Sequence, residues 1–180
     1  SYGLSGGTLN TISMSYGGSQ LVTATGFSLN VSNMAYASPS RVEQALLAGS
    51  DTIVSAWEQG DSYRTYGGDD WIELGSGNDS VDGGTGTDTF VVSVHSSTAS
   101  VSTTNAGFRI ESAYGKDSLK NVEIVSFSDK SVSLQKGGSS SETLTGDRAA
   151  VALTDYISGG SGNDKIDGGR GEDFLFGDAG

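Results

Sequence analysis

Aspartate residues recur at a fixed interval in two parts of this 180-residue chain. Thirteen of the fifteen Asp residues fall within residues 51–88 and 147–178. Consecutive members stand nine residues apart in two series: Asp61, Asp70, Asp79 and Asp88, then Asp155, Asp164 and Asp173. A solvated acidic surface has no reason to space its carboxylates regularly. Because carboxylates are preferred ligands of hard divalent cations, the spacing predicts a series of cation sites.

The elements that position these carboxylates can be read from the residues around them. An apolar or aromatic residue stands two positions after each Asp of the two series and after Asp51: Ile53, Tyr63, Ile72, Val81, Phe90, Ile157, Ile166 and Leu175. A nine-residue period with Asp in a fixed place is typical of a parallel β-solenoid, in which three residues around the apolar one form a short strand. Two such repeats make one coil of 18 residues. We therefore predict an all-β fold, a parallel β-roll (β-solenoid).

Glycines precede most of these Asp residues at alternate positions. They allow positive φ values, so that backbone carbonyls turn toward a common point beside the carboxylate. Calcium takes six to eight hard oxygen ligands in forgiving geometry, which fits such a loop better than zinc, copper or magnesium. The predicted carbonyl donors are Gly68, Gly75, Gly77, Gly84, Gly86, Gly160, Gly162, Gly169 and Gly171, and the predicted carboxylate ligands are the seven Asp of the two series. A metal-free solenoid with Asx-type turns is the alternative, but stacked like carboxylates would repel one another in it.

Three nine-residue segments, 83–91, 159–167 and 168–176, follow the pattern Gly-Gly-x-Gly-x-Asp-x-apolar-x. In this the sequence resembles the RTX (hemolysin-type) family of secreted bacterial calcium-binding repeats. The resemblance is strong over residues 65–91 and 155–178, and weak for the units at Asp51 and Asp61. It implies ions between loops two repeats apart, which pairs Asp61 with Asp79, Asp70 with Asp88 and Asp155 with Asp173. Asp164 would pair near Asp147 or beyond Gly180. We expect about three to five calcium ions.

The segments outside the repeats read mostly as strands. Alternating patterns predict strands within residues 8–14, 20–31, 89–94, 107–112, 122–127 and 131–134. Residues 38–49 form the one predicted helix, with Ser40 and Glu43 at capping-box spacing. We therefore divide the chain into an N-terminal β and cap segment (1–45), a first repeat run (46–92), a β segment that caps or continues the roll (93–136) and a second, truncated repeat run (137–180).

Composition excludes several classes of function. The net charge of −12 argues against nucleic acid or an anionic membrane as partner, and zero Cys excludes disulfides and thiolate zinc sites. No apolar run is long enough for a transmembrane helix. The first residue is Ser, and the last four residues look like the start of a further repeat. We therefore expect a monomeric module of a longer chain.

The leading hypothesis is a non-catalytic calcium-binding module of a larger secreted bacterial protein, exported by type I secretion as the resemblance implies, that folds when it binds extracellular calcium. His95, the only His, has no catalytic motif around it and is read as an ordinary residue. One alternative is a calcium-dependent adhesion or carbohydrate-binding domain, in which Trp57, Trp71, Tyr63 and Tyr66 contact a glycan at the cell surface. Trp71 is expected to point away from the core. The other alternative is an accessory module of a secreted enzyme whose catalytic domain lies elsewhere.

Overall fold

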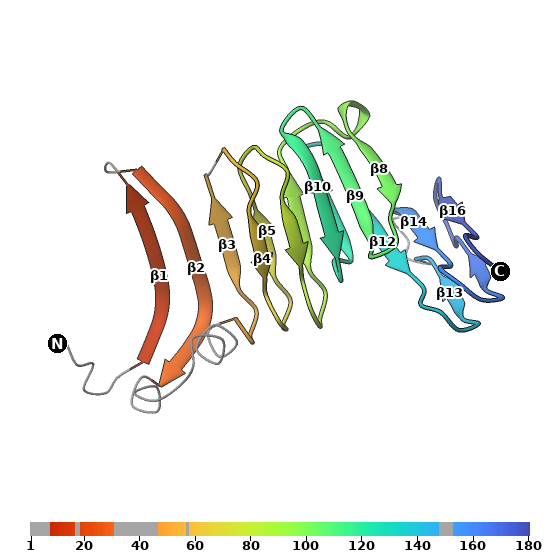
Figure 1. The fold of residues 1–180 in the computed structure, drawn as a ribbon, viewed down its shortest axis with the longest axis horizontal. Coiled ribbons are helices and arrows are strands. Elements are labelled where there is room, and N and C mark those ends of the chain that lie inside the picture. The colour runs from red at the N-terminus through yellow and green to blue at the C-terminus, as the bar shows by residue number, and fades with distance from the viewer. Residues whose placement is uncertain (1–7, 17–18, 31–46, 57, 148–152) are drawn as a thin grey trace.

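The computed structural model describes residues 8–16, 19–30, 47–56, 58–147 and 153–180, with the backbone alone for the first two ranges. In these residues the chain forms a long row of strands with β1 at one end and β16 at the other (Figure 1). One sheet of nine strands runs through the whole row, in the order β1 (Thr8–Tyr16), β2 (Ser19–Asn30), β3 (Thr52–Ser55), β5 (Trp71–Glu73), β7 (Thr89–Val92), β11 (Ile124–Phe127), β12 (Ser131–Lys136), β14 (Thr154–Ser158) and β16 (Phe174–Phe176).

Two smaller sheets supply the other faces of the coils. A five-stranded sheet has the order β4 (Ser62–Arg64), β6 (Ser80–Asp82), β10 (Gly115–Lys120), β9 (Phe108–Ser112) and β8 (Ser100–Thr103). A two-stranded sheet pairs β13 (Thr143–Thr145) with β15 (Lys165–Asp167). In the part of the chain that the structure describes, the only helix is a 3-10 turn, η2 (Ser96–Thr98). The all-β parallel β-roll predicted from the nine-residue period is confirmed.

The apolar residues of the repeats form the first core because they recur in register. Parallel pairing places Ile53 beside Ile72, Ile72 beside Phe90, and Phe90 beside Val125 along the nine-stranded sheet. These four side chains are at most 2% exposed. A strand of three or four residues presents only one or two side chains to the core, so each strand depends on its neighbours for burial.

A hairpin inserted between β7 and β10 closes one end of this first core. Strand β9 pairs antiparallel with β10, and β8 pairs antiparallel with β9. Phe108 and Ile110 of β9 are 3% and 0% exposed and belong to the same cluster as Val125. The insertion therefore extends the five-stranded sheet over β11 and β12 and contributes to the core itself.

The two repeat runs are joined by a reversal of strand direction. Strands β3, β5, β7 and β11 are parallel, whereas β12 returns antiparallel to β11 and then pairs parallel with β14. Leu134 of β12 faces the first core and lies beside Tyr156 of β14. Neighbouring residues of a strand point to opposite faces, so Ile157 points away from the first core.

The second run therefore builds its core on the opposite face of the shared sheet. Ile157 is 0% exposed there, and Leu144 of β13 is 7% exposed. In the second run the strands of the shared sheet point the opposite way, which alone would invert the hand of the coil. The second layer of this run also lies on the opposite face, which inverts the hand a second time. Both runs consequently have coils of the same hand.

Most of the predicted strands are present: 8–14 and 20–31 correspond to β1 and β2, and the four later segments correspond to β7, β9, β11 and β12. Strands β8, β10 and β13 were not predicted. The predicted helix lies outside the described residues except for its last three positions, which are bends. Among the described residues, no helix is long and apolar enough to cross a membrane.

Candidate calcium sites in the stacked loops

The loops before the strands stack on one another with very little space between their backbones. Gly68 N–H donates to the carbonyl of Thr85 at 2.8 Å, and Thr85 N–H donates to the carbonyl of Tyr66 at 3.1 Å. Eight of the nine predicted carbonyl donors have positive φ, and Gly75 is the exception. These loops therefore have the conformation that the Gly pattern predicted.

Gly68 shows why a side chain is excluded. Its φ is +108°, and an added Cβ would overlap the backbone of Gly49 in the neighbouring loop. We expect Gly68→Ala to lower the free energy of unfolding in calcium by about 1–3 kcal/mol, because it combines a strained φ with a backbone overlap. Urea denaturation measures this. Gly177→Ala is the matched control, because nothing lies within 4 Å of its added Cβ, and an equal loss in both variants would contradict the prediction.

Along one edge of the first run, each carboxylate accepts a hydrogen bond from the backbone of the acid one coil earlier. Asp61 N–H donates to Asp79 Oδ1 at 2.8 Å, and Asp79 N–H donates to Asp117 Oδ1 at 3.0 Å. Asp79 and Asp117 are 3% and 5% exposed. The first pair is the one that the resemblance implies, whereas Asp117 lies outside both repeat runs and was not predicted.

The opposite edge carries a longer series of the same kind. Asp51 N–H donates to Asp70 Oδ1 at 2.8 Å, Asp70 N–H to Asp88 Oδ1 at 3.0 Å, and Asp88 N–H to Glu123 Oε2 at 2.9 Å. The structure thus places Asp70 and Asp88 together as expected. It also adds an acid at each end of this pair, Asp51 and Glu123.

In the second run, one expected pair is present, and Asp164 has a partner that the sequence reasoning did not name. Asp155 N–H donates to Asp173 Oδ1 at 3.2 Å, as expected for that pair. Asp164, however, accepts a hydrogen bond from Glu142 N–H at 2.9 Å, and Asp147 N–H donates to Asp155 at 2.9 Å. Strand β13 pairs parallel with β15, which places Glu142 one coil before Asp164, and the amide of Asp147 lies at Asp155.

The acids missed by the sequence reasoning carry a signal that could have found them. Asp117, Glu123 and Glu142 each stand two positions before a buried apolar residue: Leu119, Val125 and Leu144. This is the spacing seen in the repeats. The glycines that make a repeat easy to recognise are partly absent around them.

Several carboxylate oxygens in these stacks are buried without a hydrogen-bond partner among the described residues: both oxygens of Asp51, and Oδ2 of Asp70, Asp88 and Asp164. Burial raises the pKa of Asp51 to about 7, with a smaller contribution from the charge of Asp70. Burial likewise raises the pKa of Asp88 to about 7 and that of Asp117 to about 6, and neighbouring carboxylates add to both shifts. Buried anionic oxygens of this kind require a cation or a proton.

The donor set therefore fits calcium: buried carboxylate oxygens lie in loops whose glycines a Cβ would obstruct. In the described ranges, no three Asp, Glu or His side chains gather around one point. Backbone carbonyls would have to complete the coordination, which suits a hard ion with a high coordination number.

Asp82 shows that an acid in the repeat window need not belong to the stacks. It is the last residue of β6, an inner strand of the five-stranded sheet, and its Oδ2 lies 3.1 Å from Arg64 and 2.9 Å from Lys120. Hydrogen bonds from Lys120, Asn121 and Arg64 outweigh partial burial and hold the pKa of Asp82 below its usual value. This carboxylate is already neutralised by protein groups.

Three of the four aromatic residues considered for glycan contact lie in the described part of the chain, and their surroundings differ. Trp71 is 44% exposed and points away from the core, as predicted. Tyr63, in contrast, pairs with the core residue Val81, and Tyr66 lies under the Arg64 guanidinium, 5.5 Å from its ring centre. Trp57 lies outside the described residues.

His95 is exposed and caps η2. Its Nδ1 accepts from the Ser97 backbone N–H at 3.3 Å, and its Nε2 lies 3.6 Å from Asp129 Oδ2. The side chain is 60% exposed. These contacts hold the loop between β7 and β8, and the imidazole is a surface residue as the sequence indicated.

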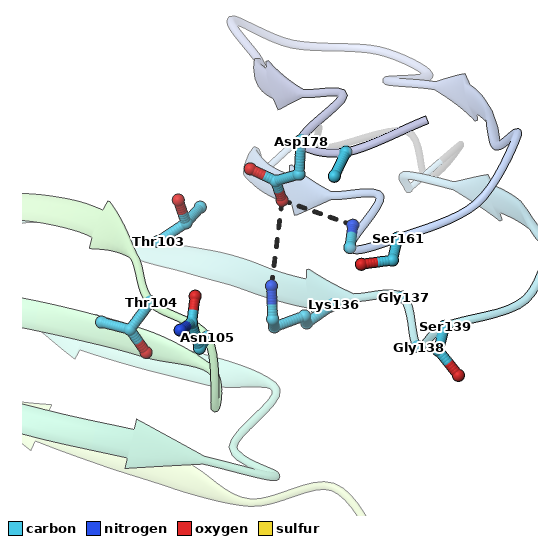
Figure 2. A pocket seen from close by; sticks show the side chains of 11 residues that line it. Thr103, Thr104, Asn105, Lys136, Gly137, Gly138, Ser139, Ser161 and Asp178 are labelled. Carbon is cyan, nitrogen blue, oxygen red and sulfur yellow. Dashed lines mark hydrogen bonds and ion pairs between the residues drawn. The ribbon is translucent and has the colours of Figure 1, made fainter.

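A cavity of about 600 Å³ lies where the β segment (93–136) meets the second run, between the end of β8 and the loops after β12 and β14 (Figure 2). Lys136 and Asp178 face each other in it, with 3.8 Å between Nζ and Oδ2 (Figure 2). Hydrogen bonds from Ser158 and Gly160, together with the Lys136 charge, lower the pKa of Asp178. These contacts connect the second run to β12, the last strand of the β segment.

The geometry defines a class of protein, the β-rolls whose stacked Gly-Asp loops bind cations. A family model of the RTX calcium-binding nonapeptide repeat matches residues 59–90 and 151–180, with four copies. These two segments of the chain therefore contain copies of that repeat.

No curated protein matches the chain. Among solved structures, the extracellular lipase LipA from Serratia marcescens matches with a TM-score of 0.37 and 16% identity over 73% of this chain. The chain spans only 25% of that lipase.

Proposed function

We propose that this chain is a calcium-binding RTX β-roll module of a larger secreted protein, and that it folds on binding calcium after export. The observation that carries the proposal is the series of buried, incompletely hydrogen-bonded carboxylates at the edges of the roll. The proposed ligands are the seven Asp of the two nine-residue series, with loop carbonyls at the positive-φ glycines.

The chain's own chemistry explains why folding would depend on the ion. Without a cation, each coil brings a buried carboxylate next to that of the neighbouring coil, which destabilises the roll. The strands bury too few apolar side chains to offset this repulsion alone. Calcium neutralises the carboxylates and joins successive loops, so its binding free energy becomes folding free energy.

Circular dichroism tests the proposal. We expect EDTA to abolish most of the β signal and excess calcium to restore it in a cooperative transition. Magnesium at the same concentration is the control, and it should restore little, because it holds its waters too firmly for a loop cage. A β signal that is unchanged on chelation would contradict the proposal.

The proposed role is non-catalytic, because the two matched segments are calcium-binding repeats and the acids of the roll are explained by its loops. We propose the division at 1–45, 46–92, 93–136 and 137–180 as the functional organisation of the module. RTX repeat proteins are typically secreted, which supports an extracellular location. Glycan contact stays a prediction, with Trp71 as its exposed candidate.

A further inference from the structure

Asp51 is a buried acid outside the segments that the RTX repeat model matches. It is 2% exposed, and among the described residues neither of its carboxylate oxygens has a hydrogen-bond partner. Buried polar side chains are almost always satisfied, so this carboxylate requires an explanation. Asp70, its neighbour in the next coil, is 3% exposed and also has one carboxylate oxygen without a hydrogen-bond partner among the described residues.

The loop of residues 47–51 stacks on the loop of residues 65–70 in the manner of two repeats. The amide of Asp51 donates to Asp70 Oδ1 at 2.8 Å, and the amide of Asp69 donates to Ser50 Oγ at 3.0 Å. The carbonyl of Asp51 accepts a hydrogen bond from Trp71 N–H at 2.9 Å, which leads into the parallel pairing of β3 with β5. Loop and strand therefore both continue the repeat geometry, although Gly49 is the only glycine of the pattern that remains.

We propose that Asp51 and Asp70 hold a further Ca²⁺ ion between these two loops, so that cation binding begins one coil before the first recognised repeat. This inference rests on the proposed function, and it concerns a residue that the repeat pattern alone left in doubt. The ion would be held by both carboxylates and by loop carbonyls of residues 47–51 and 65–70.

The alternative occupant of a buried carboxyl group is a proton. A protonated Asp51 would bury a hydroxyl donor, and a proton shared with Asp70 would require a hydrogen bond between the two side chains. No such bond exists, since both Asp51 oxygens lack partners. Protonation would therefore replace an unpaired charge with an unpaired donor, whereas a divalent ion between the loops satisfies the carboxylate.

The site has a structural consequence. Strand β2 joins β3 antiparallel from the other side, so β3 is the first strand of the parallel stack. An ion between the two loops would fix this first coil to the second one. We therefore expect Asp51 to set the point at which calcium-dependent order begins.

The test counts bound calcium in Asp51→Asn and in the wild type. Native mass spectrometry or equilibrium dialysis at saturating calcium should show one ion fewer in the variant. The calcium concentration at half-folding, followed by circular dichroism, should rise about two- to tenfold. Glu58→Gln is the control, because it removes one negative charge from an exposed position, and it should change neither quantity.

The outcomes separate this inference from the proposed function. A wild type that binds no calcium contradicts the proposed function itself. If the wild type binds calcium and Asp51→Asn keeps every ion, only the site at Asp51 is excluded. A lower half-folding concentration in the variant would also overturn the site, because it would mean that Asp51 is merely a destabilising buried charge. Failure of the variant to fold at any calcium concentration would also overturn the site, because removal of one calcium site at the end of the stack should leave the other sites able to fold the roll.

Discussion

Lowering the pH from 8 to 5 in calcium-free solution is expected to stabilise the roll. The pKa values of Asp51 and Asp88 are raised from 3.8 to about 7, and that of Asp117 to about 6, chiefly by burial. The folded chain therefore holds more protons than the unfolded chain between about pH 4 and pH 7. The stability that these protons provide is full below about pH 4 and is lost as the pH rises through 6 to 7.

Protons and calcium should compete for the same carboxylates, although each of them alone stabilises the roll. In calcium-free protein, the free energy of unfolding should increase by a few kcal/mol between pH 8 and pH 5. In the presence of calcium, the affinity for the ion should fall over the same range, because protons compete for its ligands. Asp82 does not oppose this trend, since its lowered pKa matters only below pH 4.

Circular dichroism in EDTA at several pH values follows the first effect as β signal that returns when the pH falls, and calcium titrations at the same pH values measure the second. An apo protein that is less stable at pH 5 than at pH 8 would show that the buried carboxylates are charged and satisfied by protein groups alone. That result would remove the physical reason for calcium at these positions.

Replacing Ile110 by Ala is expected to cost about 2–5 kcal/mol of stability in saturating calcium, even though Ile110 lies outside every repeat. Its side chain is 0% exposed and belongs to the cluster that also contains Ile72 and Phe90 of the repeats. The cavity left by the substitution would lie in the first core. The inserted β8–β9 hairpin therefore supports the calcium loops indirectly, because β9 pairs with β10, which carries Asp117.

Val54→Ala is the control for Ile110→Ala. Val54 lies on the outer face of β3 and is 41% exposed, so its truncation should change stability by no more than about 0.5 kcal/mol. The urea midpoints of both variants are compared at the same calcium concentration, and the midpoint of Ile110→Ala should be clearly the lower one. If Ile110→Ala is as mild as the control, the hairpin is a peripheral cap and makes no contribution to the core.

The amino-acid sequence was sufficient to predict the repeat period and the strands of the repeats, and its resemblance to the RTX repeats implied three of the acid pairs. It could do so because each repeat is a local unit: the glycine conformation, the Asp and the apolar residue all lie within nine residues. Two repeats per coil, together with the stacking that the resemblance to the RTX repeats implies, then place Asp70 beside Asp88. The same reasoning found most of the strands outside the repeats, whose alternation is also local.

How the two runs are joined, and which further acids enter the stacks, depends on contacts between distant parts of the chain. After the β11–β12 hairpin the strands run in the opposite direction, so a coil of unchanged hand has its second layer on the opposite face of the shared sheet. Asp117 and Glu142 reach the stacks through pairing with strands 38 and 22 residues away. The residues that pair between such distant strands are fixed by burial across the whole roll, so they cannot be predicted from a segment of nine residues.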